Sequence, residues 1–291
     1  MPVSVVTDST AYLPEGLAER RGIRQVPMHV LVDGCKRLDG VELGPADLVA
    51  ALGRRVAVST SRPTPGEFTT VYADALRGGA DAVVSVHLSR ALSGTWEAAR
   101  LAAEQVGAER VRVVDSRTTG MGLGFAVLAA AAVAATGGDL DAVFHTAERV
   151  AARTCTYFSV DTLEYLRRGG RIGSATALLG TALAVKPLLH VDSGRIVPLE
   201  KVRTAARARA RLVELVVRAA GRGPVDLAVH HLGAAYRAAE LVEQLHARLP
   251  ALAECLISEV GAALGAHAGP GMLGVVVLPG GLAAASAPAD S

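Results

Sequence analysis

Hydroxyl groups gather at points in the sequence where predicted strands end and predicted helices begin. Four segments share this placement: Thr7-Asp8-Ser9-Thr10, Ser59-Thr60-Ser61, Leu92-Ser93-Gly94-Thr95 and Asp115-Ser116. Hydroxyls and free backbone N–H groups at a helix N-terminus bind anions, and ligands of open parallel sheets bind beyond the carboxyl ends of the strands. Helix capping explains any one segment, because Ser, Thr and Asp are preferred N-caps. Four segments at one sheet edge predict a site for a small anionic group.

Ser93 and His267 raise the alternative of a Ser/His acyl-transfer enzyme. Ser93 lies in the sequence ALSGT, which differs from the GxSxG elbow of α/β-hydrolases. His267 lies in AHAGPG and could be its base, but no acid is obviously placed to orient it. A histidine beside a Gly-Pro-Gly turn is held rigidly and can also donate a hydrogen bond to a carboxylate. Both interpretations stay open at this point.

Three arginines surround a double glycine in DTLEYLRRGGRIG, residues Asp161 to Gly173. Arg167, Arg168 and Arg171 fit the end of a helix, where cations are favourable and glycine caps the chain. The functional alternative is a basic surface for a partner.

Charge and aromatic content argue against a nucleic-acid-binding protein. The net charge is +2 and aromatic residues make up 3% of the chain, so neither a basic patch nor a stacking surface is expected. The densest arginine group is interpreted as a solvated helix face; it comprises Arg203, Arg207, Arg209 and Arg211.

The sequence predicts neither a metal nor a cofactor. Its three cysteines are odd in number and far apart, which indicates reduced thiols. HExxH is absent, and the adjacent His230 and His231 would point to opposite faces of a strand. A phosphate-binding GxxxxGK[ST] loop is also absent, and the glycines at 120, 122 and 124 lack dinucleotide spacing.

The chain is expected to be cytoplasmic. Met1 to Thr7 reads directly as a strand, with no signal peptide before it. The apolar run Leu123 to Ala135 is shorter than the about 20 residues that a membrane span needs, so it is interpreted as a buried helix.

The first half of the chain predicts an α/β domain with a parallel sheet, because strands alternate with helices. The strands are Val3–Val6, Ala80–Leu88 and Val111–Val114, and the helices are Gly66–Leu76, Thr95–Val106, Gly124–Ala135 and Leu140–Ala151.

The second half predicts an α+β domain with a mixed sheet, since Asp192-Ser193-Gly194 marks a hairpin. The hairpin strands are followed by further helices and strands: Thr204–Ala220, Leu227–His231, Ala234–Leu249, Cys255–Glu259 and Leu273–Leu278. The expected domains are residues 1–151 and 152–281, with a disordered tail over 282–291.

Seven segments in chain order resemble the DegV family of bacterial fatty-acid-binding proteins. They run over nearly the whole chain: VTDST at Val6, TSRPTPGEF at Thr60, LSGTWEAA at Leu92, VVDSRTTGMGLG at Val113, DTLEYLRRGGRIG at Asp161, KPLLHVDSGRI at Lys186 and HAGPGMLG at His267.

The resemblance implies a DegV-type two-domain fold and a buried long-chain fatty acid. It also implies a carrier, not an enzyme, which hands the acid to a separate ATP-dependent fatty acid kinase that makes acyl phosphate. No other cofactor is implied, and membrane contact would be transient rather than by stable insertion. A lipid-dependent regulatory protein is a further alternative.

The resemblance also assigns residues to the ligand. By motif position Thr60 and Ser93 would bind the carboxylate and His267 would support it, while Ser61, Gly94 and Thr95 would shape the same loops. Arg171 and Arg203 match positions that could meet the kinase or the transferred phosphate. The chain departs from the family at Arg62, where glutamine is common. That arginine could add charge to the carboxylate site or face solvent.

Overall fold

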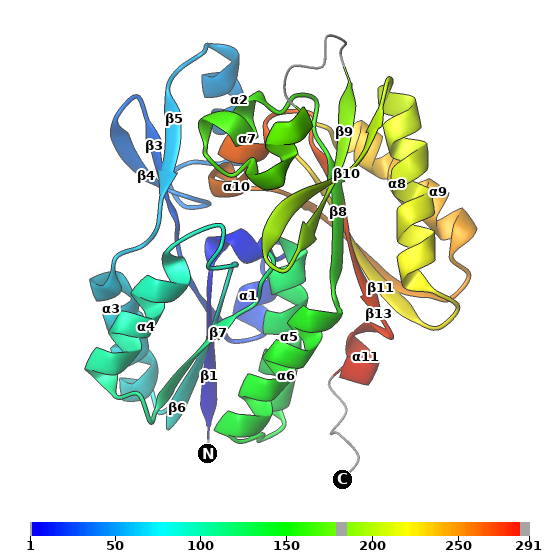
Figure 1. Cartoon of the computed structure of the whole chain (residues 1–291). Helices are drawn as coiled ribbons and strands as arrows, with labels where there is room; N and C mark the ends of the chain where they lie inside the picture. The colour runs from blue at the N-terminus through cyan, green and yellow to red at the C-terminus, as the bar shows by residue number, and fades with distance from the viewer. Residues whose placement is uncertain (1, 179–184, 286–291) are drawn as a thin grey trace.

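A four-stranded parallel sheet forms the first half of the chain, in a computed structural model that describes residues 2–178 and 185–285 (Figure 1). Its order is β2-β1-β6-β7, with β1 Val3–Asp8, β2 Ile23–Val26, β6 Ala82–His87 and β7 Val111–Asp115. All six residues of β6 are buried, as expected of a strand covered on both faces. The predicted parallel sheet is confirmed, and β2 is an addition to it.

Helices cover both faces of this sheet. α3 (Pro65–Arg77) and α4 (Thr95–Val106) pack on one face, and α5 (Met121–Ala135) and α6 (Leu140–Arg153) on the other. α3 begins with a capping box: Thr64 accepts from the Glu67 N–H while the Glu67 carboxylate accepts from the Thr64 N–H.

A six-stranded mixed sheet forms the second half, in the order β10-β9-β8-β13-β11-β12. Only β11 and β12 pair in parallel. α8 and α9 cover its outer face. The mixed sheet was predicted, but β8 was not. The bounds are β8 Cys155–Ser159, β9 Lys186–Asp192, β10 Arg195–Val202, α8 Ala205–Ala220, β11 Val225–His231, α9 Ala235–Arg248, β12 Leu252–Glu259 and β13 Leu273–Pro279.

α5 lies between the two sheets, as Figure 1 shows. It contacts β1 and β6 on one side and β13 on the other. Its residues from Met121 to Ala131 are all buried, which explains why the helix is apolar all round. One hydrophobic core therefore runs from Val5 in the first sheet to Val276 in the second, and the boundary after residue 151 stays a prediction.

A small antiparallel sheet, β4-β3-β5, was not predicted. It comprises β3 His29–Val32, β4 Cys35–Leu38 and β5 Val58–Ser61. The expectation that Ser59-Thr60-Ser61 ends a strand of the parallel sheet was wrong. This segment is itself a strand, paired with β3.

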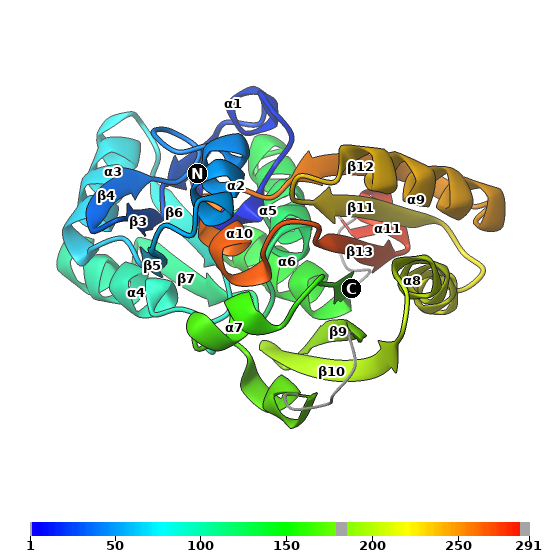
Figure 2. The same ribbon diagram turned by 90° about the horizontal axis from the view of Figure 1, so that it is seen from above.

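Short helices complete the fold. One of them, α10, contacts both β5 and α7, and Figure 2 shows it next to these two elements. The α-helices are α1 Leu17–Arg20, α2 Pro45–Gly53, α7 Glu164–Arg168, α10 Ala262–Ala268 and α11 Gly281–Ala285, and the 3-10 helices are Ser9–Ala11 and Gly173–Leu178.

α11 corrects the prediction that the chain is disordered from Leu282 onward. The Leu282 N–H donates to Asp226 Oδ2 at 2.7 Å, and the Leu282 side chain packs against the core. Residues 286–291 of the expected tail lie outside the described residues. Over the part of the chain that the structure describes, no helix is long and apolar enough to cross a membrane.

Candidate functional site

A narrow cavity lies where the two halves of the molecule meet. Its volume is about 80 Å³. Its wall is mostly apolar and comes from both halves, with Met28, Leu88 and Leu92 from the first and Phe158, Leu166, Val191, Ile196, Leu264, Met272 and Val275 from the second. A slender apolar chain fits this shape.

The β9–β10 hairpin closes one side of the cavity through Val191 and Ile196. Its tip is fixed to the first half of the molecule, because Ser89 Oγ donates to the Gly194 carbonyl oxygen at 2.8 Å. Gly194 has φ +80, and a Cβ there would meet Ser89 Oγ at 2.3 Å. Glycine is therefore needed at this turn for both conformation and space.

Most of the predicted ligand residues share the wall of this cavity. Thr60, Ser61, Ser93, Arg171 and His267 all line it. Thr95 does not line it but hydrogen-bonds to Ser93. Gly94 is the N-cap residue of α4 and lies against Arg62.

Arg203 lies apart from the other predicted site residues. It is exposed between β10 and α8 and lines none of the described cavities. The structure does not bring it to the head-group wall.

Thr60 and His267 form one polar pair of the wall. Thr60 Oγ1 and His267 Nε2 are 2.7 Å apart. Burial, and then the nearby positive charge of Arg171, lower the pKa of His267 to about 4. The imidazole is therefore neutral at physiological pH.

Ser93 and Thr95 form the second polar pair, with their hydroxyl oxygens 2.8 Å apart. Thr95 Oγ1 also donates to Met28 Sδ at 3.4 Å. Sulfur is a weak acceptor, so the Thr95 proton can turn to Ser93 at small cost. Ser93 can then give its own proton to a ligand.

The arginines of the Asp161–Gly173 segment divide into two kinds. Arg167 and Arg168 pair with Glu164 on the surface of α7, as the structural interpretation predicts. Arg171 instead turns inward, where its Nε donates to the Leu92 carbonyl oxygen at 3.0 Å and its Nη1 to that of Gly169 at 2.6 Å. Arg171 thus ties α7 to the loop that carries Ser93.

Arg62 lines the cavity although the residue as a whole is exposed. It therefore lies at the mouth of the cavity. Its side chain both lines the cavity and faces solvent, so the two expectations for this position each hold in part.

Sequence reasoning missed His230 as a wall residue. Its Nε2 accepts from the Met121 N–H at 2.8 Å, and its Nδ1–H donates to the Ser258 carbonyl oxygen at 3.2 Å. Burial lowers its pKa to about 4, so it holds the start of α5 as a neutral ring. Because side chains alternate between the two faces of a strand, the sequence predicted that His230 and His231 point to opposite faces of β11. It gave no indication of which face lines the cavity.

The VTDST segment, Val6 to Thr10, holds two residues of the cavity wall in place. Asp8 Oδ1 accepts from the Thr10 N–H at 3.0 Å, and Asp8 Oδ2 accepts from the Leu88 N–H at 3.0 Å. Both Thr10 and Leu88 line the cavity. The same carboxylate is 3.0 Å from His87 Nδ1, and His87 Nε2 is 2.7 Å from Ser85 Oγ.

The geometry gives little support to an acyl-transfer site. Ser93 and His267 hydrogen-bond to different hydroxyls, and no carboxylate is among the described residues that line the cavity. The Asp8-His87-Ser85 series resembles a triad in order, but all three side chains are buried away from the cavity. Among the described residues no cluster of His, Cys, Asp and Glu could hold a metal.

Comparison with known proteins decides the family. A family model described as an uncharacterised protein of the DegV family matches residues 2–280. The chain belongs to the DegV family. A DegV domain-containing protein of Streptomyces coelicolor is 54% identical over 275 residues, which is 94% of this chain and 98% of that protein.

Solved DegV structures share the fold. A DegV family protein from Thermus thermophilus, described as fatty acid binding, superposes with a TM-score of 0.91 and 37% identity, covering 96% of this chain and all of that one. DegV from Bacillus subtilis, described as a fatty acid binding protein, gives 0.86 and 35%, with 95% and 99% covered.

Proposed function

We propose that this protein binds a long-chain fatty acid in the cavity and presents its carboxylate, without transforming it, to a separate ATP-dependent fatty acid kinase. The observation that carries the proposal is a narrow apolar cavity lined by Thr60, Ser93 and His267, in which the Thr60 hydroxyl pairs with His267 and the Ser93 hydroxyl pairs with Thr95.

The hydroxyls of Thr60 and Ser93 suit a carboxylate. A carboxylate in an apolar pocket must accept hydrogen bonds, or it takes up a proton instead. Thr60 is hydrogen-bonded to His267 and Ser93 to Thr95. When these partners donate, the hydroxyl protons of Thr60 and Ser93 are free for the ligand. A donor that is itself hydrogen-bonded is polarised and binds more strongly.

The apolar wall suits the tail. Burial of a methylene contributes about 0.8 kcal/mol, so about 15 methylenes offer roughly 12 kcal/mol before the costs of association are subtracted. Affinity comes from the tail and orientation from the hydroxyls, a division that fits a carrier.

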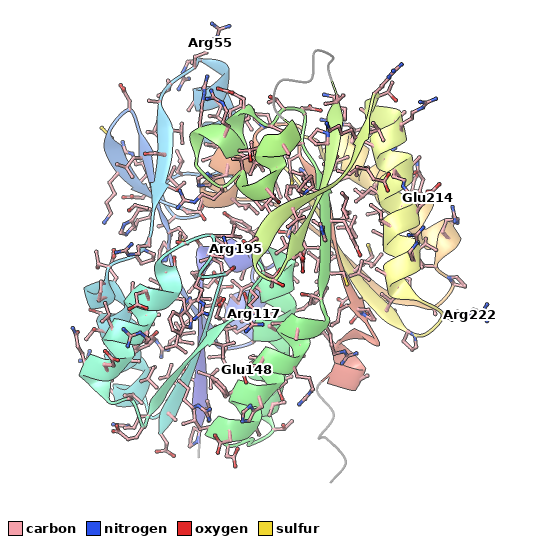
Figure 3. The ribbon with its side chains drawn as sticks, viewed as in Figure 1. Arg55, Arg117, Glu148, Arg195, Glu214 and Arg222 are labelled. Carbon is pink, nitrogen blue, oxygen red and sulfur yellow. The ribbon has the colours of Figure 1, made fainter. Side chains whose placement is uncertain are left out.

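In this proposal the head group lies next to a second cleft. This wider cleft also touches Thr60, Arg171 and His267, and its rim includes Arg55 and Arg168. Arg55 projects from the upper edge of the molecule in Figure 3. No acidic residue lines this cleft within the described ranges. We propose that the kinase approaches here and that Arg171 faces the transferred phosphate. Arg203 would contact the kinase at a separate place.

This proposal places the protein in the cytoplasm, where ATP is available, with transient membrane contact to collect or deliver lipid. The two expected domains, residues 1–151 and 152–281, would contribute the two sides of the cavity.

The first test is denaturing extraction of the purified protein, followed by mass spectrometry of the released lipids. About one fatty acid per chain, dominated by one or two species, supports the carrier. A protein that releases no fatty acid and takes up none when it is added would rule out the proposal.

The second test adds a purified fatty acid kinase and ATP to the loaded protein. Acyl phosphate should form only with kinase present, and formation by the protein alone would mean that it is an enzyme. A fluorophosphonate probe checks the acyl-transfer alternative, which predicts covalent labelling of Ser93.

A further inference from the structure

Gly169 lies directly against the ring of His267. An ideal Cβ on Gly169 would stand 1.9 Å from His267 Nδ1 and 2.6 Å from Cε1, distances that no real side chain tolerates. Gly169 has φ −74 and ψ −7, a right-handed helical conformation open to any residue. Its glycine is therefore required by the histidine and not by the backbone.

The next residue shows the opposite case. Gly170 has φ +69, and an added Cβ would have no atom within 4 Å. Its glycine is required by the backbone and not by a neighbour. The two adjacent glycines of the Arg-Gly-Gly segment thus serve different purposes.

The His267 ring is held between two elements. On one side Nε2 is 2.7 Å from Thr60 Oγ1 on β5. On the other, Nδ1 is buried and has no hydrogen-bond partner among the described residues. The α-hydrogen of Gly169 that replaces a Cβ points at Nδ1.

This contact decides where the ring carries its proton. A neutral imidazole has one N–H donor and one acceptor nitrogen. A proton on Nδ1 would point into the carbon-bound hydrogen of Gly169, whereas a bare Nδ1 fits there. The proton therefore belongs on Nε2, which donates to Thr60 Oγ1.

We propose that Gly169 is a positioning residue that fixes His267 in the Nε2–H tautomer and so leaves the Thr60 hydroxyl proton free for the ligand. Thr60 accepts from His267, and its own proton must point elsewhere, into the cavity. In the other tautomer Thr60 would donate to the ring and offer the ligand only an acceptor. This inference rests on the proposed function, since the group to which Thr60 donates is the carboxylate of the proposed fatty acid.

The tautomer can be measured without any change at position 169. Protein labelled with ¹⁵N-histidine gives ring nitrogen shifts at neutral pH through long-range ¹H–¹⁵N correlation, and His267→Ala identifies the His267 signals by their loss. Protonated Nε2 with bare Nδ1 is the expected result. Protonated Nδ1 would overturn the proposal.

A double-mutant cycle tests the role of Gly169 in binding. Gly169→Ala is made in the wild type and in His267→Ala, and affinity for a fluorescent fatty acid is measured on delipidated protein. In the wild type the substitution should weaken binding about tenfold to a hundredfold, the size of a hydrogen bond to a charged group. In His267→Ala, where the ring is gone, the change should be less than about twofold, because mutations of contacting residues are not additive. Equal losses in both backgrounds would overturn the proposal.

Gly53→Ala is the matched control, because an added Cβ at the end of α2 meets nothing within 4 Å; it should leave affinity unchanged. If the wild type binds no fatty acid at all, the proposed function fails, while the tautomer measurement still decides the role of Gly169.

Discussion

His87 and His267 sit in two polar regions that look alike and differ in one respect. Each ring lies next to a hydroxyl at 2.7 Å, that of Ser85 or of Thr60. His87 uses its second nitrogen as well, at 3.0 Å from Asp8 Oδ2. In His267 the second nitrogen has no partner within the described part of the chain.

The difference separates a structural network from the proposed binding site. The Asp8-His87-Ser85 network is closed, since Ser85 also accepts from the Tyr72 hydroxyl at 2.8 Å and all members are buried. Such a network rigidifies the core. The Thr60–His267 pair is open on the cavity side, so a hydroxyl proton is left for a ligand. Changes in the first region should cost stability, and changes in the second should cost affinity.

The largest expected effect is that of Asp8→Ala in the closed network. The substitution leaves the N–H groups of Thr10 and Leu88 and the His87 ring without their acceptor. We expect the free energy of unfolding to fall by about 3–5 kcal/mol, because several buried donors lose their partner at once. Urea unfolding measures the loss. A loss below about 1 kcal/mol would contradict the structural role of the network.

Acidification should destabilise the protein through His267 and His230. Both have a folded-state pKa of about 4, below the ordinary value near 6.5. Between these values the unfolded chain binds the protons and the folded chain does not. The free energy of unfolding should therefore fall as the pH falls from about 6.5 to about 4, by up to about 3 kcal/mol per histidine.

Urea unfolding at a series of pH values measures this slope. His267→Gln should make it shallower, whereas His145→Gln, at an exposed position, should not. A slope unchanged by His267→Gln would mean that this ring is charged or exposed in the folded protein.

Thr60→Val and Ser93→Ala should reduce affinity more than stability. Each removes one of the proposed donors to the carboxylate, and we expect fatty acid binding to weaken about tenfold to a hundredfold. Thr60→Val should be the more severe, because it also leaves the His267 Nε2–H without an acceptor. Titration of delipidated protein measures the affinity, with Thr70→Ala on the exposed face of α3 as control. Unchanged affinity in both variants would place the carboxylate elsewhere.

The smallest expected effect belongs to Arg62→Gln, which removes the charge and keeps a polar side chain. An exposed charge at the cavity mouth contributes about 0–1 kcal/mol, so affinity should fall by less than about fivefold, and less still at high salt. A larger, salt-independent loss would mean that Arg62 contacts the buried carboxylate directly.

The sequence predicted the elements with strong patterns and missed those without them. α4 was predicted at Thr95–Val106 and is found there, because apolar residues recur at helical spacing. β5 reads Val-Ser-Thr-Ser, and so short and polar a strand has no hydrophobic signal. α11 was missed because its stability comes from a contact with Asp226, which is distant in the chain.

The candidate site was likewise predicted where local sequence patterns exist and missed where contacts join distant residues. Hydroxyl-rich segments indicated an anion site, but Ser59–Ser61 reached the cavity from a different sheet than expected. The pairing of Thr60 with His267, and the packing of Gly169 against that ring, join residues far apart in sequence. No local pattern encodes such contacts, so the resemblance to a family supplied the residues and the structure supplied their arrangement.

Helix α5, buried between both sheets, makes the unfolding of the two halves a single event. If either sheet unfolds, one side of a helix that is apolar throughout becomes exposed to water. We therefore expect that neither half stays folded without the other. In a calorimeter the chain should melt in one peak, with equal van't Hoff and calorimetric enthalpies, as a small one-domain protein does. A substitution that destabilises either half should then lower the melting temperature of the whole chain.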